Sequence, residues 1–303
     1  METAVRKSIV EDQVMVAAPA ELVRQLICDV TSWPQWYRPA VHAEFLEPDL
    51  IQHWMLVDDH SVQTWRERRR LSDDGTQVFA VREVGGAPDV TTWTVEEQPY
   101  GKTALRVRAE VSAGSREADE AIADGCREFL DAVRDRAERA EELDRLVISF
   151  EDPLFVSGGL EDCYDYLFEA DKWPERVPHV LALDLEQPSP TVQFFDMDTR
   201  SADGSEHTTR SVRICLSGNK IVYKQIKPPA TMDAHTGHWT FTETPEGILL
   251  GARHTCTIRP EGLHLLGEGT TVEGARRYLR KVLSANSMGN LRLTKEYAEE
   301  RAK

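Results

Sequence analysis

The sequence contains two diverged copies of one pattern, and this repeat constrains the fold more than any other feature. Residues 29–34 read Asp-Val-Thr-Ser-Trp-Pro, and residues 169–174, which lie 140 positions later, read Glu-Ala-Asp-Lys-Trp-Pro. A short segment with helical periodicity precedes each copy, near 20–29 and 160–170. The repeat therefore predicts two domains of the same architecture.

Each half continues with strands and ends in a long helix. About six strand-like segments follow each Trp-Pro copy, and turn signals such as Asp74-Gly75 and Gly218-Asn219 separate them. Apolar residues at helical spacing then predict a helix over about 115–146 in the first half and about 272–300 in the second. Each half thus predicts an antiparallel meander followed by a helix.

This order of elements favours an α+β fold. We expect two tandem domains, at 1–147 and 148–303, each with a curved antiparallel sheet around its long C-terminal helix. A sheet curled around a helix leaves a cavity between them. This geometry is better suited to enclosing a ligand than to forming a loop that cradles phosphate groups. Neither G-x-G-x-x-G nor G-x-x-x-x-G-K-[ST] occurs in the sequence.

The charge balance excludes several classes of partner. The chain has 36 Lys and Arg against 52 Asp and Glu, so its formal net charge is −16, which repels nucleic acids and anionic lipids. No run approaches the roughly 18 apolar residues of a membrane span, and the start lacks the apolar core of a signal peptide. The five cysteines form no C-x-x-C pair. We expect a cytoplasmic protein with reduced thiols that binds neither nucleic acid nor membrane.

One strand of the first half concentrates charged side chains. Within residues 61–70, Trp65, Glu67 and Arg69 share one face, because side chains alternate along a strand. If this face is buried, a guanidinium and a carboxylate lie side by side beneath an aromatic ring, and a buried charge requires a partner or a function. The alternative is a ladder of ion pairs on the exposed surface.

The second half places different residues in the equivalent strand. Thr209, Ser211 and Arg213 share a face, so two hydroxyls accompany one guanidinium. Trp93 and Trp239 open matching strands, 24 and 26 residues after the two arginines. Tryptophan supplies apolar area and arginine a fixed fork of donors, as a mixed polar and apolar cavity needs. For any single tryptophan, ordinary core packing is the alternative.

The histidines do not predict a metal site. His235 and His238 lie on opposite faces of an extended segment, and no carboxylate or thiolate cluster completes a ligand set. Either histidine can act as a general acid or base, or be an ordinary core or surface residue. No G-x-S-x-G elbow and no Cys-His-Asn arrangement suggests a nucleophile.

These residues resemble the didomain aromatase/cyclases of bacterial type II polyketide synthases, whose domains adopt the START-like helix-grip fold. The resemblance covers essentially the whole chain. The first half carries it at 29–34, at 62–70 and in the Trp93 strand. The second half carries longer motifs, at 173–179, 207–213, 221–225, 228–230, 235–239, 252–255 and 282–287.

The resemblance implies roles for particular residues. Relatives use a pocket arginine with a nearby serine and flanking tryptophans. In this sequence Arg69 and Arg213 match the arginine, and Ser211 matches the serine of the second half. In the first half, Glu67 occupies the position where a serine is expected. We expect Arg69 and Arg213 to polarise substrate carbonyls, Ser211 to relay protons, and Glu67 to hold Arg69 or act as a base. The expected substrate-binding residues are Trp33, Trp36, Tyr37, Trp65, Trp93, Trp173, Thr209, Lys224, His235 and Trp239.

The implied activity is cyclisation of a poly-β-ketone tethered to an acyl carrier protein by phosphopantetheine, without a cofactor or a metal. The expected reaction is a C7–C12 aldol closure, a dehydrative aromatisation, or both. Arg276, Arg277, Arg280 and Lys281 are candidates for docking the carrier, or simply a solvated helix face. Two alternatives remain: a non-catalytic protein that binds lipids or other hydrophobic ligands, and one catalytic domain with a structural partner.

Overall fold

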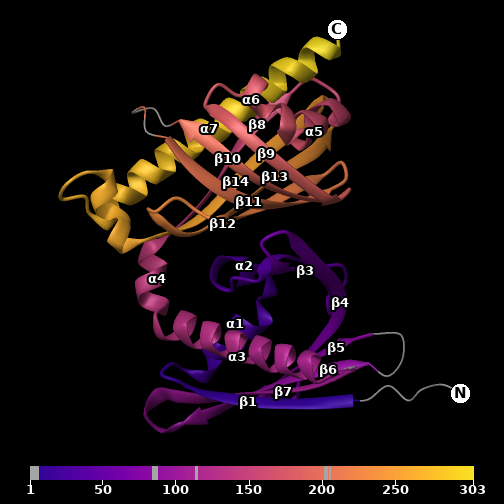
Figure 1. The fold of residues 1–303 in the computed structure, drawn as a ribbon, viewed down its shortest axis with the longest axis vertical. Helices are drawn as coiled ribbons and strands as arrows, with labels where there is room; N and C mark the ends of the chain where they lie inside the picture. The colour runs from indigo at the N-terminus through magenta and orange to yellow at the C-terminus, as the bar shows by residue number, and fades with distance from the viewer. Residues whose placement is uncertain (1–6, 84–87, 113–114, 201–203, 205) are drawn as a thin grey trace, which may run out of the picture. The chain divides into compact units, whose positions relative to one another are not determined.

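The computed structural model describes residues 7–83, 88–112, 115–200, 204 and 206–303. The chain divides into two compact units, one of Met1–Leu56 with Val62–Glu142 and one of Val57–Ser61 with Leu143–Lys303. We call them the N-terminal unit and the C-terminal unit. Each has a curved antiparallel sheet and a long helix (Figure 1).

The sheet of the N-terminal unit has seven strands in the order β1-β7-β6-β5-β4-β3-β2. The strands are β1 (Lys7–Val16), β2 (Ala40–Phe45), β3 (Leu50–Asp58), β4 (Ser61–Leu71), β5 (Gln77–Arg82), β6 (Asp89–Gln98) and β7 (Lys102–Ser112). The helices are α1 (Ala20–Cys28), the short α2 (Trp33–Trp36), the long α3 (Arg116–Glu138) and α4 (Ala140–Leu146).

The C-terminal unit repeats this arrangement, with its strands in the order β8-β14-β13-β12-β11-β10-β9. The strands are β8 (Val147–Val156), β9 (Val180–Ser189), β10 (Val192–Arg200), β11 (Glu206–Leu216), β12 (Lys220–Lys227), β13 (Met232–Thr244) and β14 (Gly247–Ile258). The helices are α5 (Leu160–Phe168), the short α6 (Trp173–Arg176) and the long α7 (Val272–Arg301).

The structure corrects the sequence prediction at two places. Each described sheet has seven strands rather than six, because β1 and β8 were missed. Both are edge strands, where charged residues and Pro153 are tolerated, so their apolar alternation is weak. The first long helix is interrupted at Arg139, whose backbone leaves the helical range, and continues as α4.

The two long helices occupy equivalent positions in their units. The buried residues Phe129, Leu130, Val133 and Ala137 of α3 have the same spacing as Asn290, Leu291, Thr294 and Ala298 of α7. One matching hydrogen bond in each unit fixes the equivalence. The Ala17 N–H donates to Glu138 Oε1 at 2.7 Å, and the Ser157 N–H donates to Glu299 Oε1 at 2.8 Å. Position 129 therefore corresponds to 290.

The described helices include none that is long and apolar enough to cross a bilayer. The long helices instead bury one apolar face against their own sheets, with Leu130 and Leu291 fully buried.

We predict that Leu130→Ala and Leu291→Ala each lower the free energy of unfolding by about 2–5 kcal/mol, because each removes a buried side chain and leaves a cavity. Urea unfolding of the full chain measures the change. Leu265→Ala, at a side chain that is 56% exposed, is the control and should change it by less than about 0.5 kcal/mol. Equal losses in all three variants would contradict the proposed cores.

Candidate functional site

Arg69 lies buried on the inner face of the N-terminal sheet, on β4. Its guanidinium carbon is 4.8 Å from the ring centre of Trp33 and 5.1 Å from that of Trp93. One terminal nitrogen donates to the carbonyl of Ile27 at 2.6 Å, near the C-terminal end of α1. This cation is therefore held by two aromatic faces and by the negative end of a helix dipole.

Glu67 pairs with Arg69 and carries its own polar partners. Its Oε1 accepts from Nε of Arg69 at 3.1 Å and from a terminal nitrogen of the same guanidinium. His53 Nε2 is 3.2 Å from Oε1, and Trp65 Nε1 donates to Oε2 at 3.2 Å. Of the two arrangements that the sequence left open for β4, the structure shows the buried one.

The pKa of Glu67 follows from this environment. Burial by itself raises the pKa of a carboxyl, but the Arg69 charge, His53 and the Trp65 N–H outweigh burial and hold the pKa of Glu67 at about 2. Glu67 is thus a stable carboxylate and a weak base at neutral pH.

Aromatic side chains fill the space beside Arg69. Phe129 of α3 contacts four rings, at centre-to-centre distances of 4.8 Å to Trp33, 6.1 Å to Trp36, 5.2 Å to Tyr37 and 5.7 Å to Trp93. These predicted substrate-binding residues come together as one aromatic cluster. Trp65 is half-buried and stacks on His53.

Arg213 occupies the equivalent position in the C-terminal unit and is fully buried. Its terminal nitrogens donate to the carbonyls of Leu167 and Phe168, both at 3.0 Å, at the end of α5. The guanidinium carbon is 5.2 Å from the ring centre of Trp173 and 6.0 Å from that of Trp239. Its Nε has no hydrogen-bond partner among the described residues.

The groups beside Arg213 are neutral. Ser211 and Thr209 lie on the same side of β11 and are buried, and Thr209 Oγ1 has no partner within the described ranges. In the ladder, Phe195 lies opposite Ser211. Among the described residues no carboxylate pairs with Arg213, whereas Arg69 of the N-terminal unit pairs with Glu67.

A second polar cluster lies on the inner face of the same sheet. The Tyr223 hydroxyl is 2.7 Å from His254 Nδ1 and 3.4 Å from His235 Nε2, and these two ring nitrogens are 3.1 Å apart. His235 Nδ1 is 2.8 Å from Gln225 Oε1. Gly237 makes room for the phenol, because a Cβ there would lie 2.3 Å from the Tyr223 hydroxyl oxygen.

Burial keeps this cluster uncharged. It lowers the pKa of His235 to about 3, with a further contribution from His254, and lowers the pKa of His254 to about 4. It also raises the pKa of the Tyr223 phenol. At neutral pH the cluster is a chain of neutral donors and acceptors.

Lys224 does not join these groups. It alternates with Tyr223 and Gln225 along β12, so its side chain lies on the opposite face of the sheet from Arg213. Lys224 therefore does not face Arg213, and its binding of the substrate stays a prediction. His235 faces the interior, as its predicted role requires.

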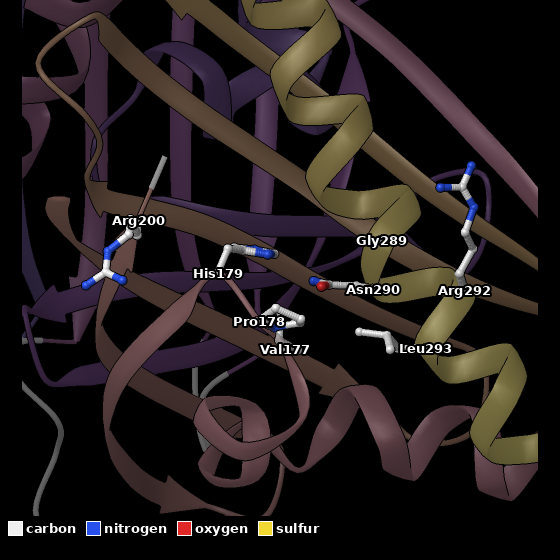
Figure 2. Close-up of a pocket in the computed structure, with 8 residues that line it drawn as sticks. All are labelled: Val177, Pro178, His179, Arg200, Gly289, Asn290, Arg292 and Leu293. Atoms are coloured by element: carbon white, nitrogen blue, oxygen red, sulfur yellow. The ribbon is translucent and has the colours of Figure 1, made fainter. Parts of the chain in front are cut away.

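A cavity of about 460 Å³ opens between α7 and the segment after α6. Figure 2 shows the residues that line it, with His179 and Asn290 reaching toward one another across the space. The lining residues are Val177, Pro178, His179, Arg200, Gly289, Asn290, Arg292 and Leu293. The described residues include no group of three or more His, Cys, Asp or Glu side chains that could hold a metal ion.

Sequence analysis missed several residues of these clusters. His53 lies outside the motifs and Asn290 lies three residues beyond the motif at 282–287, and nothing in their local sequence marks either residue. Tyr223 and His254 fall within quoted motifs, but only strand pairing shows that they meet. A paired comparison of α3 with α7 is the signal that would have found Asn290.

The chain is similar to curated proteins over nearly its whole length, although no family model matches it. It is 35% identical to the granaticin polyketide synthase bifunctional cyclase/dehydratase of Streptomyces violaceoruber, over 95% of this chain and 94% of that protein. It is 36% identical to the actinorhodin polyketide synthase bifunctional cyclase/dehydratase of Streptomyces coelicolor, over 91% and 92%.

Two solved structures match the whole architecture. The di-domain ARO/CYC StfQ from the steffimycin biosynthetic pathway is 51% identical, with a TM-score of 0.90 over 97% of this chain and 99% of that one. The di-domain ARO/CYC BexL from the BE-7585A biosynthetic pathway is 33% identical, with a TM-score of 0.87 over the same shares. These matches confirm the predicted α+β fold with two tandem domains.

We predict that Glu67→Gln lowers the free energy of unfolding by about 3–5 kcal/mol at pH 7, because it leaves the buried Arg69 charge without its carboxylate. The folded-state pKa of Glu67 lies below its ordinary value, so its contribution is present above about pH 4.5 and is lost as the pH falls toward 2. Urea unfolding at pH 7 and pH 3 tests this, with the exposed Glu97→Gln as control. A variant as stable as the parent at pH 7 would contradict the pairing.

The histidine cluster predicts a second pH dependence. A histidine in the unfolded chain has a pKa near 6.5, whereas the pKa values of His235 and His254 in the folded chain are about 3 and about 4. The stabilisation that depends on their neutral form is therefore fully present above about pH 6.5, and the free energy of unfolding falls as the pH is lowered. Between pH 7.5 and pH 5 we expect a loss of about 2 kcal/mol for each histidine. His235→Gln should reduce this dependence, while the exposed His264→Gln should leave it unchanged. The same pH dependence in both variants would contradict the assignment.

Proposed function

Because this chain belongs to the family of polyketide synthase bifunctional cyclase/dehydratases, we propose that it closes and dehydrates a ring in a linear poly-β-ketone. The ring is the first one, closed by a C7–C12 aldol step. The substrate is carried on the phosphopantetheine arm of an acyl carrier protein, within a type II polyketide synthase of the cytoplasm.

The observation that carries this proposal is the buried guanidinium of each unit. Arg69 and Arg213 lie on the inner faces of their sheets, each between two tryptophans and each anchored by main-chain carbonyls. A guanidinium has five N–H donors, and these contacts leave some of them available to a substrate oxygen. The Nε–H of Arg213, which has no partner among the residues that the structure describes, is one such donor.

The aldol step needs positioning more than a strong base. A methylene between two ketones is acidic, so it loses a proton to form an enolate. The enolate carbon then attacks a ketone carbon in the same chain, and the ketone oxygen becomes an alkoxide that takes up a proton. Holding the floppy chain in one register can supply up to roughly 7–11 kcal/mol in ideal intramolecular cases.

The arginines act on the oxygen atoms of this step. Negative charge develops on the enolate and on the alkoxide oxygen, and a guanidinium donor that is already in place stabilises both. Such a donor is worth about 10²–10³ in rate. Arg69 cannot drift away from this position, since Glu67 and the Ile27 carbonyl hold it.

The dehydration step removes the new hydroxyl and a neighbouring proton as one water molecule. Ser211 lies on the same side of β11 as Arg213 and relays the proton or holds the departing water. His235 is neutral and buried nearby within the Tyr223 cluster. Because burial lowers its pKa to about 3, it is a weak base, and it acts by hydrogen bonding rather than by taking the proton. Glu67 positions Arg69 rather than acting as the base, in keeping with its low pKa.

These steps form one carbon–carbon bond, transfer protons and break one carbon–oxygen bond with release of water, without net oxidation or reduction, so the proposed reaction needs no cofactor and no metal. The buried guanidinium groups of Arg69 and Arg213 also weigh against a non-catalytic carrier of hydrophobic ligands, whose interior would be nearly all apolar. The curated relatives are named as cyclase/dehydratases, which supports an enzyme.

We predict that Arg69→Gln or Arg213→Gln lowers the rate of formation of the normal ring product by about 10²–10³. The measurement uses the minimal synthase with its carrier protein and follows the products with time. Arg66→Gln is the matched control, since Arg66 lies on the exposed face of β4 and donates to Gln52.

The outcomes are distinct. A loss in only one arginine variant would assign the chemistry to that unit and leave the other as a binding or supporting unit. Normal products at the normal rate from both arginine variants would overturn the proposed role of the guanidinium groups.

A further inference from the structure

The two units differ in one respect that the proposed function leaves unexplained. The cavity of about 460 Å³ in the C-terminal unit lies where the N-terminal unit has its aromatic cluster. We propose that this cavity binds the phosphopantetheine arm of the carrier protein, with its amide-bearing part inside and its phosphodiester at Arg292. This inference rests on the proposed function, because it assumes a carrier-bound substrate.

The cavity exists because three aromatic positions are replaced. The equivalence of α2 with α6 and of α3 with α7 relates Trp36, Tyr37 and Phe129 of the N-terminal unit to Arg176, Val177 and Asn290 of the C-terminal unit. Valine and asparagine are much smaller than the rings that they replace. Arg176 does not fill the space either, because its guanidinium lies over the Tyr166 and Tyr297 rings, at 5.0 Å and 5.4 Å.

Gly289 keeps the helix side of the cavity open. A Cβ at this position would have no heavy atom within 4 Å, so the residue borders empty space rather than a packed neighbour. Glycine is less favourable than alanine inside a helix. A glycine in the middle of α7 therefore weakens the helix while leaving room for a ligand.

Asn290 supplies the polar group of this cavity. Its side chain is 8% exposed, and its Oδ1 has no hydrogen-bond partner among the residues that the structure describes. A buried, unpaired amide oxygen is costly, and an N–H donor from a ligand would satisfy it. Figure 2 shows His179 on the other side of the space, and burial lowers the pKa of His179, so it is a neutral partner.

The mouth of the cavity carries positive charge. Arg292 lines both the cavity and a neighbouring groove of about 600 Å³ on α7. The other residues of this groove are Arg277, Arg280, Lys281, Ser284, Ala285 and Met288. In a chain with a net charge of −16, a groove whose described lining has four cations and no carboxylate selects an anionic partner.

The charge of this groove is only partly neutralised. Arg277 pairs with Glu273 and Arg280 with Asp152, but Arg292 makes no ion pair with any residue in the described part of the chain. Arg200, at the other end of the cavity, pairs with Glu206. Lys281 likewise makes no ion pair within the described ranges, but of these two cations Arg292 alone also lines the cavity, so it is the one placed to meet a phosphodiester.

The pantetheine arm matches these three features together. Its two amides offer N–H donors to Asn290 and acceptors to His179, its methylene and dimethyl groups suit Val177 and Leu293, and its phosphodiester suits Arg292. A fully apolar acyl chain would leave the Asn290 oxygen unpaired, and a free inorganic anion would not use the cavity.

The test measures binding of two free compounds, 4′-phosphopantetheine and pantetheine, to the full chain by calorimetry. We expect the parent chain to bind both and to prefer the phosphorylated compound by about two- to five-fold, as one exposed ion pair contributes. Arg292→Gln should abolish this preference without preventing the binding of pantetheine. Gly289→Phe should weaken the binding of both compounds by at least about ten-fold, since its ring fills the cavity.

Gly125→Phe is the matched control. Gly125 also lies in the middle of a long helix, and a Cβ added there would have no heavy atom within 4 Å, but it belongs to the N-terminal unit. This substitution should leave both affinities unchanged. Arg292 is exposed, so Arg292→Gln keeps the test valid even if Gly289→Phe does not fold.

Failure of this inference differs from failure of the proposed function. If the parent chain binds neither compound, or if Arg292→Gln and Gly289→Phe bind both as the parent does, the cavity does not hold the arm. The same preparations are then tested for ring formation with the minimal synthase. Ring formation by a chain that binds neither compound would overturn the inference alone, whereas binding without ring formation would overturn the proposed function alone.

Discussion

Each unit depends on one interaction, the burial of a guanidinium between tryptophan rings at the end of a helix. Removing such a charge from water is costly unless it gains partners, and here the partners are ring faces and helix carbonyls. The Trp-Pro segment supplies one ring, the sixth strand of the unit supplies the other, and the preceding helix supplies the carbonyls. The arginine therefore joins parts of the unit that are distant in the chain.

The surroundings of this buried guanidinium differ between the two units. Beside Arg69 there is a carboxylate and a packed aromatic cluster, whereas beside Arg213 there are hydroxyls and a neutral Tyr223–His235–His254 cluster. The first arrangement fixes the cation by charge. The second leaves the Nε–H of Arg213 without a partner in the described part of the chain and leaves space near α7. The two units of this chain thus have chemically distinct interiors.

Much of this architecture follows from local patterns in the sequence. The signals are short-range: the Trp-Pro copies, the helical periodicity of α3 and α7, and the alternation around Arg69 and Arg213. The helices and strands of the structure lie where these signals predict them. The edge strands β1 and β8 were not predicted, because charged residues and a proline weaken the alternation of apolar and polar residues at a sheet edge.

The site was harder to predict than the fold because its polar contacts join distant positions. His53 reaches Glu67 from a neighbouring strand, and Tyr223, His235 and His254 come from three successive strands. The role of Asn290 becomes visible only when α7 is compared with α3, because Phe129 occupies the equivalent position in α3. Lys224 shows the opposite case, because it lies within a conspicuous motif but faces away from the site.

The central claim, that both buried guanidinium groups meet the substrate oxygens, is tested most directly by nitrogen NMR of the arginine side chains. Lys substitutions at Arg69 and Arg213 assign their Nε–H signals, and a poly-β-ketone mimic that cannot cyclise is then added. The account predicts that the Arg213 Nε–H signal shifts toward that of a hydrogen-bonded donor and that the Arg69 signal also moves. Saturating mimic that leaves both signals unchanged would contradict it.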